Sequence, residues 1–231
     1  MGYRERHVAV DRTVLWQRDP TGAPGQSRIL PDGCLDIIWD GRRLFVAGPD
    51  SMARMHSDDG HAAYTALRFS AGLGPALLGV PAAELRDQTP DLDTLWPSRD
   101  ARELAERITA NPAVELERWV LRRSAVVRVD PLGDRIVRLA GTGMRVTEIA
   151  DGLGMGTRKL HRHCLALFGY GPAQLAQILR MQRALHLARS GTALADVAAS
   201  CGYADQPHLT RDIHTLAGTS PRALLRELPS R

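Results

Sequence analysis

The segment LADVAASCGYADQPHLTRDIHTLAGTSP, which runs from Leu194 to Pro221, decides the fold of the C-terminal half of this chain. A related segment, VTEIADGLGMGTRKLHRHCLALFGYGP, runs from Val146 to Pro172. A repeat of this length indicates two copies of one structural unit, and this decides the fold before individual helices and strands are assigned. With one residue inserted after the shared glycine, the matched pairs are Ile149 with Val197, Ala150 with Ala198, Gly154 with Gly202, Leu160 with Leu209, Arg162 with Arg211, Gly169 with Gly218 and Pro172 with Pro221.

Each copy has the pattern of a helix-turn-helix unit. Ala150 and Ala198 each precede the shared glycine by four residues, and a small side chain there lets two helices cross closely. Glycine then adopts the left-handed backbone that turns the chain tightly between the helices. Gly156 or Thr157 in the first copy, and Asp205 in the second, stand where the second helix begins. The repeat therefore predicts two helix-turn-helix units in one chain.

The second helix of each unit is the expected reader of DNA, because the major groove just admits an α-helix. Arginine pairs bidentately with guanine and glutamine with adenine, so the outward faces offer suitable readers. The predicted DNA contacts are Arg158, Lys159, His161 and Arg162 in the first unit, and Gln206, Pro207, Thr210 and Arg211 in the second. For Arg162 and Arg211, contact with phosphates and a role in pinning the helix inside the domain stay open as alternatives.

A linker helix is predicted between the two units. Pro172 suits the first turn of a helix, and Gly191 suits its end. The apolar residues recur at steps of three and four and form one stripe of Leu175, Ile178, Met181, Leu185 and Ala188. At 1.5 Å per residue this helix is about 27 Å long. It would hold two recognition helices near one turn of DNA, about 34 Å, apart on one face of the duplex.

Residues 131–228 resemble the DNA-binding domain of the AraC/XylS family of transcription regulators. The matching residues of the second unit are the pair Gly202-Tyr203, Leu209, Arg211 and the terminal Gly218-Thr219-Ser220-Pro221, joined by Arg180-Met181, Ala184 and Leu187 on the linker helix. Ile213 departs from this pattern at a position that is usually aromatic, and Gly156 replaces the usual hydroxyl N-cap. The resemblance implies a one-component regulator that binds double-stranded DNA, with RNA polymerase as a further candidate partner.

Members of this family usually carry a variable N-terminal domain that senses a small molecule or dimerises. Here the segment RILPDGCLDIIWDGRRLFVAGP, from Arg28 to Pro49, resembles a less-characterised N-terminal domain of some regulators of this type. That domain brings no known ligand with it. The resemblance therefore implies an unidentified small-molecule effector and a candidate homodimer.

Charge is distributed unevenly along the chain. Residues 131–231 hold 13 basic against 7 acidic side chains, whereas residues 1–130 hold 17 against 19. This distribution is expected if only the C-terminal part meets a polyanion.

No apolar run approaches the roughly 20 residues that span a bilayer, and the polar N-terminus leads into no signal-peptide core. The three cysteines lack metal-like or disulfide-like spacing. We expect a cytoplasmic protein with reduced thiols and no membrane contact.

The first 95 residues read as short strands separated by turns rich in glycine, proline and aspartate. The expected strands are Val8–Val10, Thr13–Trp16, Ile29–Leu30, Leu35–Trp39, Leu44–Ala47 and Ala63–Phe69. Helices follow from Pro97 to Arg123 and are split at Asn111-Pro112. The expected fold class is α+β with two domains. A β-rich barrel or sandwich spans 1–95, a helical connector with a candidate dimer surface spans 96–130, and an all-α domain with the two helix-turn-helix units spans 131–231.

A few side chains of the N-terminal half are candidates for a ligand or metal site. Trp16, Trp39 and Tyr64 are candidate effector-binding residues, although aromatic residues on strands more often form plain core. His56 and His61, beside two aspartates, are candidate metal ligands. A loop of two histidines without a third ordered ligand is more often solvated surface, so we expect no metal.

If the N-terminal half were an enzyme, Cys34 would be its candidate nucleophile. It lies beside Asp32 and Asp36, whose carboxylates would raise the pKa of the thiol and weaken it as a nucleophile. Two alternatives to an effector-responsive regulator stay open. One is a cupin-like or alkyl-transfer enzyme fused to a DNA-binding module, and the other is a constitutive DNA-binding protein whose N-terminal domain only assembles dimers. The expectation is a regulator without catalytic residues or cofactor.

Overall fold

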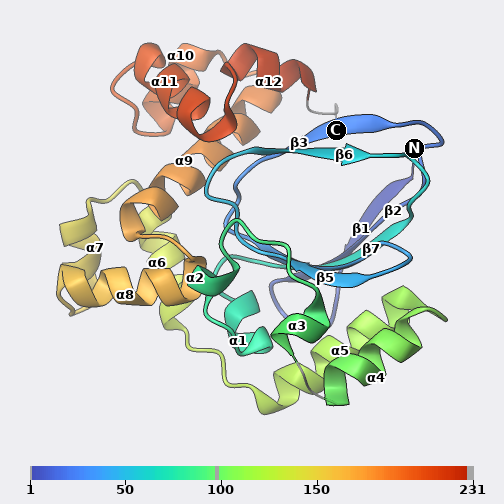
Figure 1. Cartoon of the computed structure of the whole chain (residues 1–231). Coiled ribbons are helices and arrows are strands. Elements are labelled where there is room, and N and C mark those ends of the chain that lie inside the picture. The colour runs from blue at the N-terminus through green and yellow to red at the C-terminus, as the bar shows by residue number, and fades with distance from the viewer. Residues whose placement is uncertain (1, 97–98, 228–231) are drawn as a thin grey trace.

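The computed structural model describes residues 2–96 and 99–227, and it places a β-rich N-terminal part beside a helical C-terminal part (Figure 1). The α+β class with two parts is confirmed. Pro97, where the helices were predicted to begin, and the last four residues of the predicted DNA-binding domain lie outside the described residues. No helix in the described ranges combines the length and the apolarity that crossing a membrane requires.

Five antiparallel strands form the main sheet, in the order β1-β2-β7-β4-β5. Their bounds are Tyr3–His7 for β1, Thr13–Arg18 for β2, Leu35–Trp39 for β4, Leu44–Ala47 for β5 and Tyr64–Phe69 for β7. A separate two-stranded ribbon pairs β3 (Gly25–Ile29) with β6 (Arg54–Asp58). In Figure 1 this ribbon lies above the main sheet, so the N-terminal part is a half-open barrel.

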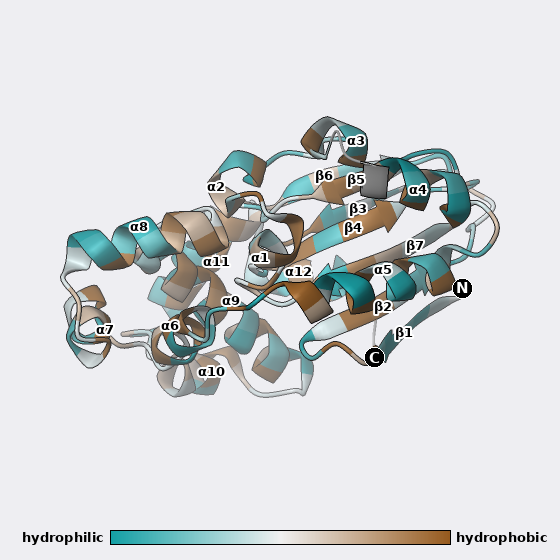
Figure 2. Ribbon diagram, turned by 90° about the horizontal axis from the view of Figure 1, so that it is seen from below, coloured by the Kyte–Doolittle hydropathy of each residue, from teal (hydrophilic) through white to brown (hydrophobic). Residues whose placement is uncertain are grey.

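Helices cover one face of the main sheet. These helices are α1 (Gly74–Leu78), α3 (Leu92–Leu95), α4 (Arg99–Ile108) and α5 (Pro112–Val126). Leu104 of α4 and Leu116 of α5 share one core with Ile37 of β4. Figure 2, seen from below, shows α4 and α5 lying across the sheet with hydrophilic and hydrophobic stretches alternating. Amphipathic helices of this kind are stabilised by burying their apolar stripe, so α4 and α5 belong to the N-terminal core.

The split between these two helices falls where it was predicted. The side chain of Asn111 accepts a hydrogen bond from the backbone N–H of Val114 at 3.4 Å, and Pro112 opens α5. The predicted connector at 96–130 is therefore mostly a packed layer of the N-terminal part. Its candidate dimer residues Leu116, Trp119 and Val120 are buried in that layer, because they face the sheet.

The C-terminal part is all helical and packs around one long central helix. Its helices are α6 (Leu132–Gly141), α7 (Val146–Gly152), α8 (Thr157–Phe168), α9 (Pro172–Arg189), α10 (Leu194–Ser200), α11 (Gln206–Ala217) and α12 (Pro221–Glu227). One further short helix of the N-terminal part, α2 (Ala82–Leu85), packs against α8. In Figure 1, α9 runs diagonally between α6–α8 on the left and α10–α12 at the top.

Two strands, β1 and β6, escaped the sequence-based prediction, and β3 overlaps the predicted strand Ile29–Leu30 only at Ile29. The predicted strand at Val8–Val10 is wrong, because these residues form the turn between β1 and β2. Every residue of β1 is exposed, and β3 and β6 are mostly polar, so no apolar alternation marks them. The three short helices α1, α2 and α3 also lie in the stretch read as strands and turns. They are too short to display a helical period.

Substitutions on α5 test whether this helix is part of the N-terminal core. Leu116 is 0% exposed, whereas Leu121 on the same helix is 45% exposed. Leu116→Ala should lower the free energy of unfolding by about 2–5 kcal/mol, because it removes buried methyl groups and leaves a cavity. Leu121→Ala should cost less than about 1 kcal/mol. Denaturant unfolding measures both variants, and equal losses would contradict the packing described.

Candidate nucleic-acid interface and ligand cavity

The first helix-turn-helix unit consists of α7, a tight turn and α8. Ala150 of α7 is 1% exposed and lies in the helix crossing, and Leu160 of α8 is fully buried. Gly154 takes the left-handed backbone with φ +65°, as the turn requires. Gly156 is the N-cap of α8 and, being glycine, supplies no side-chain hydrogen bond. The predicted geometry of this unit is confirmed.

The second unit, formed by α10 and α11, repeats this arrangement with a better cap. Ala198 is 1% exposed, and Gly202 has φ +74°. The carboxylate of Asp205 accepts a hydrogen bond from the backbone N–H of His208 at 2.6 Å, which caps α11. Ile213, at the position where the family pattern has an aromatic residue, is 1% exposed and packs in the core.

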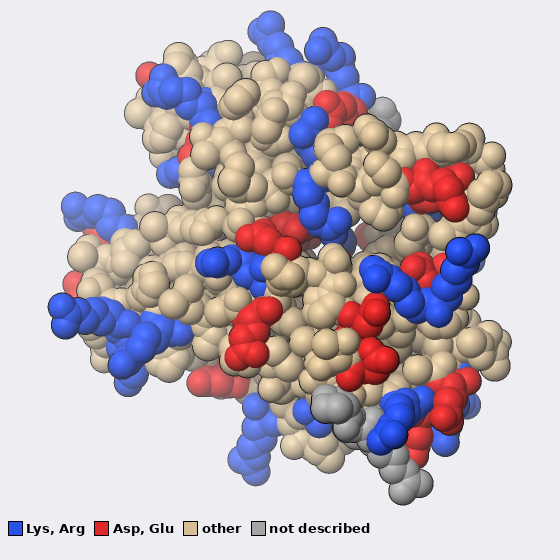
Figure 3. Space-filling model, in the orientation of Figure 1, with Lys and Arg blue, Asp and Glu red and all other residues tan. Residues whose placement is uncertain are grey.

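Most predicted DNA contacts lie on open surface. Six are exposed and two, Gln206 and Thr210, are half-buried; the exposed ones are Arg158, Lys159, His161, Arg162, Pro207 and Arg211. Among the described residues, the ion pairs of the protein include none of the three arginines or the lysine of this set. In Figure 3, basic side chains project at the left, around α7 and α8, and at the top, around α10–α12. The surface is thus free to meet a polyanion.

His161 differs from its neighbours because its ring leans on the chain that enters α9. A Cβ added to Gly171 would lie 3.0 Å from the His161 ring, so the two are in close contact. Arg162 and Arg211 do not pin their helices inside the domain, since both side chains are exposed. Of the two alternatives left open for these arginines, contact with a ligand outside the domain agrees with their exposure.

A buried polar cluster fixes the second unit on the linker helix. The carboxylate of Asp212 on α11 accepts hydrogen bonds from Arg180, at 2.9 Å, and from Gln177, both on α9. The Arg180 guanidinium also lies 4.5 Å from the ring centroid of Tyr203. Asp212 is 8% exposed, so this ion pair is shielded from solvent. Sequence reasoning assigned Arg180 to the family pattern but missed its partner, because the pairing spans 32 residues.

A cavity of about 590 Å³ lies between the main sheet and the β3–β6 ribbon. Trp16 and Tyr64, two of the predicted effector-binding residues, line it together with Ile38 and Phe45. Trp39 does not, because side chains alternate along β4 and Trp39 points to the helix-covered core instead. Gln182 of α9 also lines the cavity, so the cavity touches both parts of the molecule.

The cavity floor carries an ion pair on the sheet. The carboxylate of Asp36 accepts two hydrogen bonds from Arg68, both at 3.1 Å, and one from the Trp16 indole N–H at 3.1 Å. Cys34 lies nearby, and burial, followed by the charge of Asp32, raises the pKa of its thiol well above the ordinary value. The thiol is therefore a poor nucleophile, which removes support from a catalytic role for Cys34.

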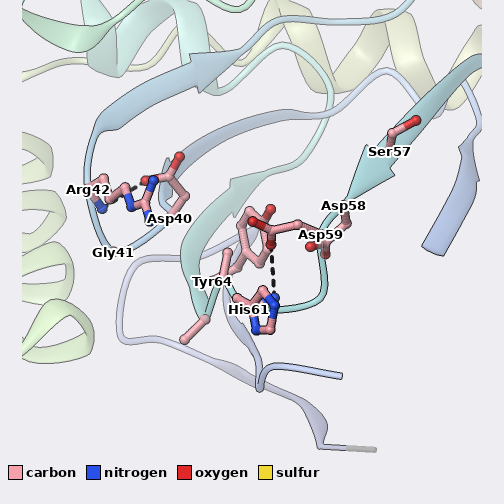
Figure 4. Close-up of a pocket in the computed structure, with 10 residues that line it drawn as sticks. Asp40, Gly41, Arg42, Ser57, Asp58, Asp59, His61 and Tyr64 are labelled. Atoms are coloured by element: carbon pink, nitrogen blue, oxygen red, sulfur yellow. Dashed lines mark hydrogen bonds between the residues drawn. The ribbon is translucent and has the colours of Figure 1, made fainter. Parts of the chain in front are cut away.

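A second hollow, of about 550 Å³, lies beside the loop between β6 and β7 (Figure 4). Its carboxylates are engaged with the turns of the chain. Asp59 accepts from the backbone N–H of His61 at 2.9 Å, and Asp40 accepts from the backbone N–H of Arg42 at 2.9 Å. His56 faces the ring of Tyr64. Within the described ranges, no three side chains of the metal-ligating types converge on one point.

Comparisons with known proteins place these features. A helix-turn-helix domain family matches residues 149–227, and a domain of unknown function (DUF6597) matches residues 7–91. The HTH-type transcriptional activator RhaS of Shigella boydii is 33% identical over 75 residues, which are 32% of this chain and 27% of that protein. The chain thus matches about a quarter of the length of this curated relative. Residues 149–227 form an AraC-type helix-turn-helix domain.

Two solved structures resemble the whole chain. A variant of ToxT from Vibrio cholerae strain SCE256 has 10% identity and a TM-score of 0.51, over 96% of this chain and 100% of that one. ToxT from Vibrio cholerae O395 has 12% identity and a TM-score of 0.49, over 100% and 98% of the two chains. At this identity the first likeness concerns the fold alone. It supports a β-rich N-terminal part joined to the AraC-type domain.

The AraC-type domain is docked on the N-terminal part through main-chain atoms. Arg28 of β3 donates to the carbonyl oxygen of Ala217 at 2.9 Å and pairs with Glu227 at 2.9 Å. On the first unit, Gly169 has φ +82°, and a Cβ there would lie 3.0 Å from the carbonyl oxygen of Ala82. Both helix-turn-helix units are therefore held by the N-terminal part, while their outward faces stay open.

The cap of α8 supplies a test of the local geometry of the AraC-type domain. Gly156 has an extended backbone and open space around it, so Gly156→Ser can add a side-chain cap without strain. The variant should gain about 0.5–1 kcal/mol of unfolding free energy, from the cap and from a less flexible unfolded chain. Gly154→Ser is the matched control, and should lose about 1 kcal/mol because φ is positive there. Thermal unfolding that shows both variants shifted in the same direction would contradict this geometry.

Proposed function

We propose that this chain is an effector-responsive transcription regulator that reads double-stranded DNA with α8 and α11 and takes a small molecule in the cavity beneath the β3–β6 ribbon. One observation carries the proposal: two recognition helices, joined by α9, present exposed basic side chains that lie outside the ion pairs of the described residues, together with half-buried polar ones. The match to a DNA-binding domain family and the basic C-terminal half support it.

The two units divide the work of recognition unequally. The first presents the cations Arg158, Lys159 and Arg162, which can pair with guanine edges or with phosphates and make the affinity depend on salt. The second presents Gln206 and Thr210, neutral groups that suit base edges in the major groove. The α9 helix of 18 residues is about 27 Å long and would set the two readers near one turn of DNA apart.

Effector binding would act through the docking of the two parts. The cavity is lined by residues of the sheet, of the ribbon and, at Gln182, of α9. A ligand there would contact both parts and shift the balance between their arrangements by its differential affinity. A regulator of this kind would also contact RNA polymerase and a second copy of the chain. It would act in the cytoplasm. An enzymatic role draws no support from Cys34, whose thiol is held protonated.

Selection of bound DNA from fragmented genomic DNA tests the regulator role. The wild-type chain should enrich a small set of fragments, whose neighbouring genes then indicate the pathway. Arg158→Ala and Gln206→Ala should change that set, because each removes a base-reading side chain worth about 1–3 kcal/mol of discrimination. Arg102→Ala, an exposed arginine on α4, is the charge-matched control. Folded variants that select the same fragments as the wild type would refute the assignment.

The salt dependence of the same variants tests the division between the units. On a selected fragment, Arg158→Ala should reduce the slope of log affinity against log salt by about 1, because one positive charge facing the DNA is lost. Gln206→Ala should leave the slope unchanged while lowering the affinity. Equal changes in slope for the two variants would contradict the division.

A further inference from the structure

Each arginine that lines the cavity has an acidic partner, and Asp32 is the one carboxylate of the described lining that accepts no hydrogen bond from an arginine. Five arginines line it, and each has an acidic partner: Arg18 with Asp58, Arg28 with Glu227, Arg43 with Asp40 and Asp91, Arg54 with Asp50, and Arg68 with Asp36. The remaining acidic residue of the lining is Asp32. The arginines therefore do not amount to a free anion site.

Asp32 lies in the turn between β3 and β4 and opens on the cavity. One of its carboxylate oxygens accepts from the backbone N–H of Cys34 at 2.8 Å. The other lies 3.9 Å from Arg68, whose guanidinium already makes two hydrogen bonds to Asp36. A third of the Asp32 side chain remains exposed. Burial raises the pKa of this carboxyl, and the charge of Arg68, which makes no hydrogen bond to it, opposes that rise only in part.

Next to this carboxylate the cavity offers flat apolar surface. Trp16, Phe45 and Tyr64 line it, and Ile38 fills the floor between them. Tyr3 stacks on Trp16 with ring centroids 6.2 Å apart, which fixes the indole in place. The Arg18 guanidinium lies 4.5 Å from the Tyr64 ring centroid and that of Arg43 lies 4.3 Å from the Phe45 ring centroid, so one face of each ring already carries a cation. Aromatic walls of this kind also accept a planar ring.

We propose that the cavity binds an organic amine, with an aromatic or other flat apolar body against Trp16 and Phe45 and a protonated amino group paired with Asp32. The inference rests on the proposed effector role of the cavity and names the chemical class of that effector. The amino group would give Asp32 the charged hydrogen-bond donor that Arg68 gives to Asp36, while Arg68 keeps its hydrogen bonds to Asp36.

The position of Asp32 also explains how such a ligand would be sensed by the AraC-type domain. The carbonyl oxygen of Pro31, the residue before it, accepts a hydrogen bond from the Gln182 side chain of α9 at 2.7 Å. On the other side, a Cβ on Gly33 would lie 3.4 Å from the Tyr170 hydroxyl, which follows α8 and has no hydrogen-bond partner among the described residues. The Asp32 turn thus touches the chain segments that carry both helix-turn-helix units.

Calorimetric titration of the full chain with three ligands of equal ring structure tests the proposal. Tryptamine carries the amine, tryptophol replaces it with a neutral hydroxyl, and indole-3-propionate replaces it with a carboxylate. We expect tryptamine to bind at least about tenfold more tightly than tryptophol, the ratio typical of a hydrogen bond to a charged group. Indole-3-propionate should bind more weakly than either.

Two variants locate the preference. Asp32→Asn keeps a side-chain oxygen that accepts from the backbone N–H of Cys34 but removes the charge, and should reduce the preference for tryptamine over tryptophol to less than about threefold. Asp50→Asn, which alters a carboxylate of the same cavity that has its own arginine, should retain it. Unfolding of each variant without ligand checks that the fold is intact.

Any of four results would overturn the proposal: no binding of tryptamine, equal binding of the three ligands, a preference for indole-3-propionate, or an unchanged preference in Asp32→Asn. Each of these leaves the regulator role standing if DNA selection by the same protein is intact. Conversely, tryptamine binding through Asp32 without selective DNA binding would refute the regulator role and keep the amine site.

Discussion

The burial of one face of α9 is the constraint on which the rest of the molecule depends. Leu175, Ile178 and Met181 are fully buried, and Leu185 is 3% exposed. The helix packs against α8 of the first unit and the adjacent α6, and against α10 and α11 of the second unit and the adjacent α12. A rigid helix that both units share cannot change their separation without breaking this core. The spacing of the two recognition helices is therefore built into the length of α9.

The same helix ties the DNA-reading surface to the N-terminal part. Its polar side carries Gln174, which donates to the carbonyl oxygen of Ser51 at 3.1 Å, and Gln182, which donates to that of Pro31 at 2.7 Å. On α11, the carbonyl oxygen of Leu216 accepts from the backbone N–H of Ala53 at 2.7 Å. Of these residues Gln182 lines the cavity, so a ligand there would act on one of the contacts that orient the DNA-reading helices.

The C-terminal half was predictable because its signals are local. The turn glycines, the cap at Asp205 and the stripe on α9 all arise within a few residues of sequence, and the repeat displays them twice. The pairing of Arg180 with Asp212 was not predictable, since it joins two helices through a geometry that no periodicity encodes.

The N-terminal half shows the limits of periodicity more sharply. The β3–β6 ribbon, one wall of the cavity, consists of polar residues with no apolar alternation, so the wall was missed and the cavity with it. Trp39 was named as an effector-binding residue although the period of two along β4 sets it opposite Asp36 and Ile38. That alternation was the available signal. Because Asp36 hydrogen-bonds to Trp16 on the cavity side of the sheet, this alternation places Trp39 on the other side, in the core.

Hydroxyl-radical footprinting of the chain on a selected DNA fragment tests the central claim most directly. Two recognition helices held by α9 should protect two clusters of sugars on one face of the duplex, with centres about 10–10.5 base pairs apart. Their spacing should be the same on every selected fragment, because the length of α9 sets it. A single protected cluster, or two clusters on opposite faces of the duplex, would contradict the account.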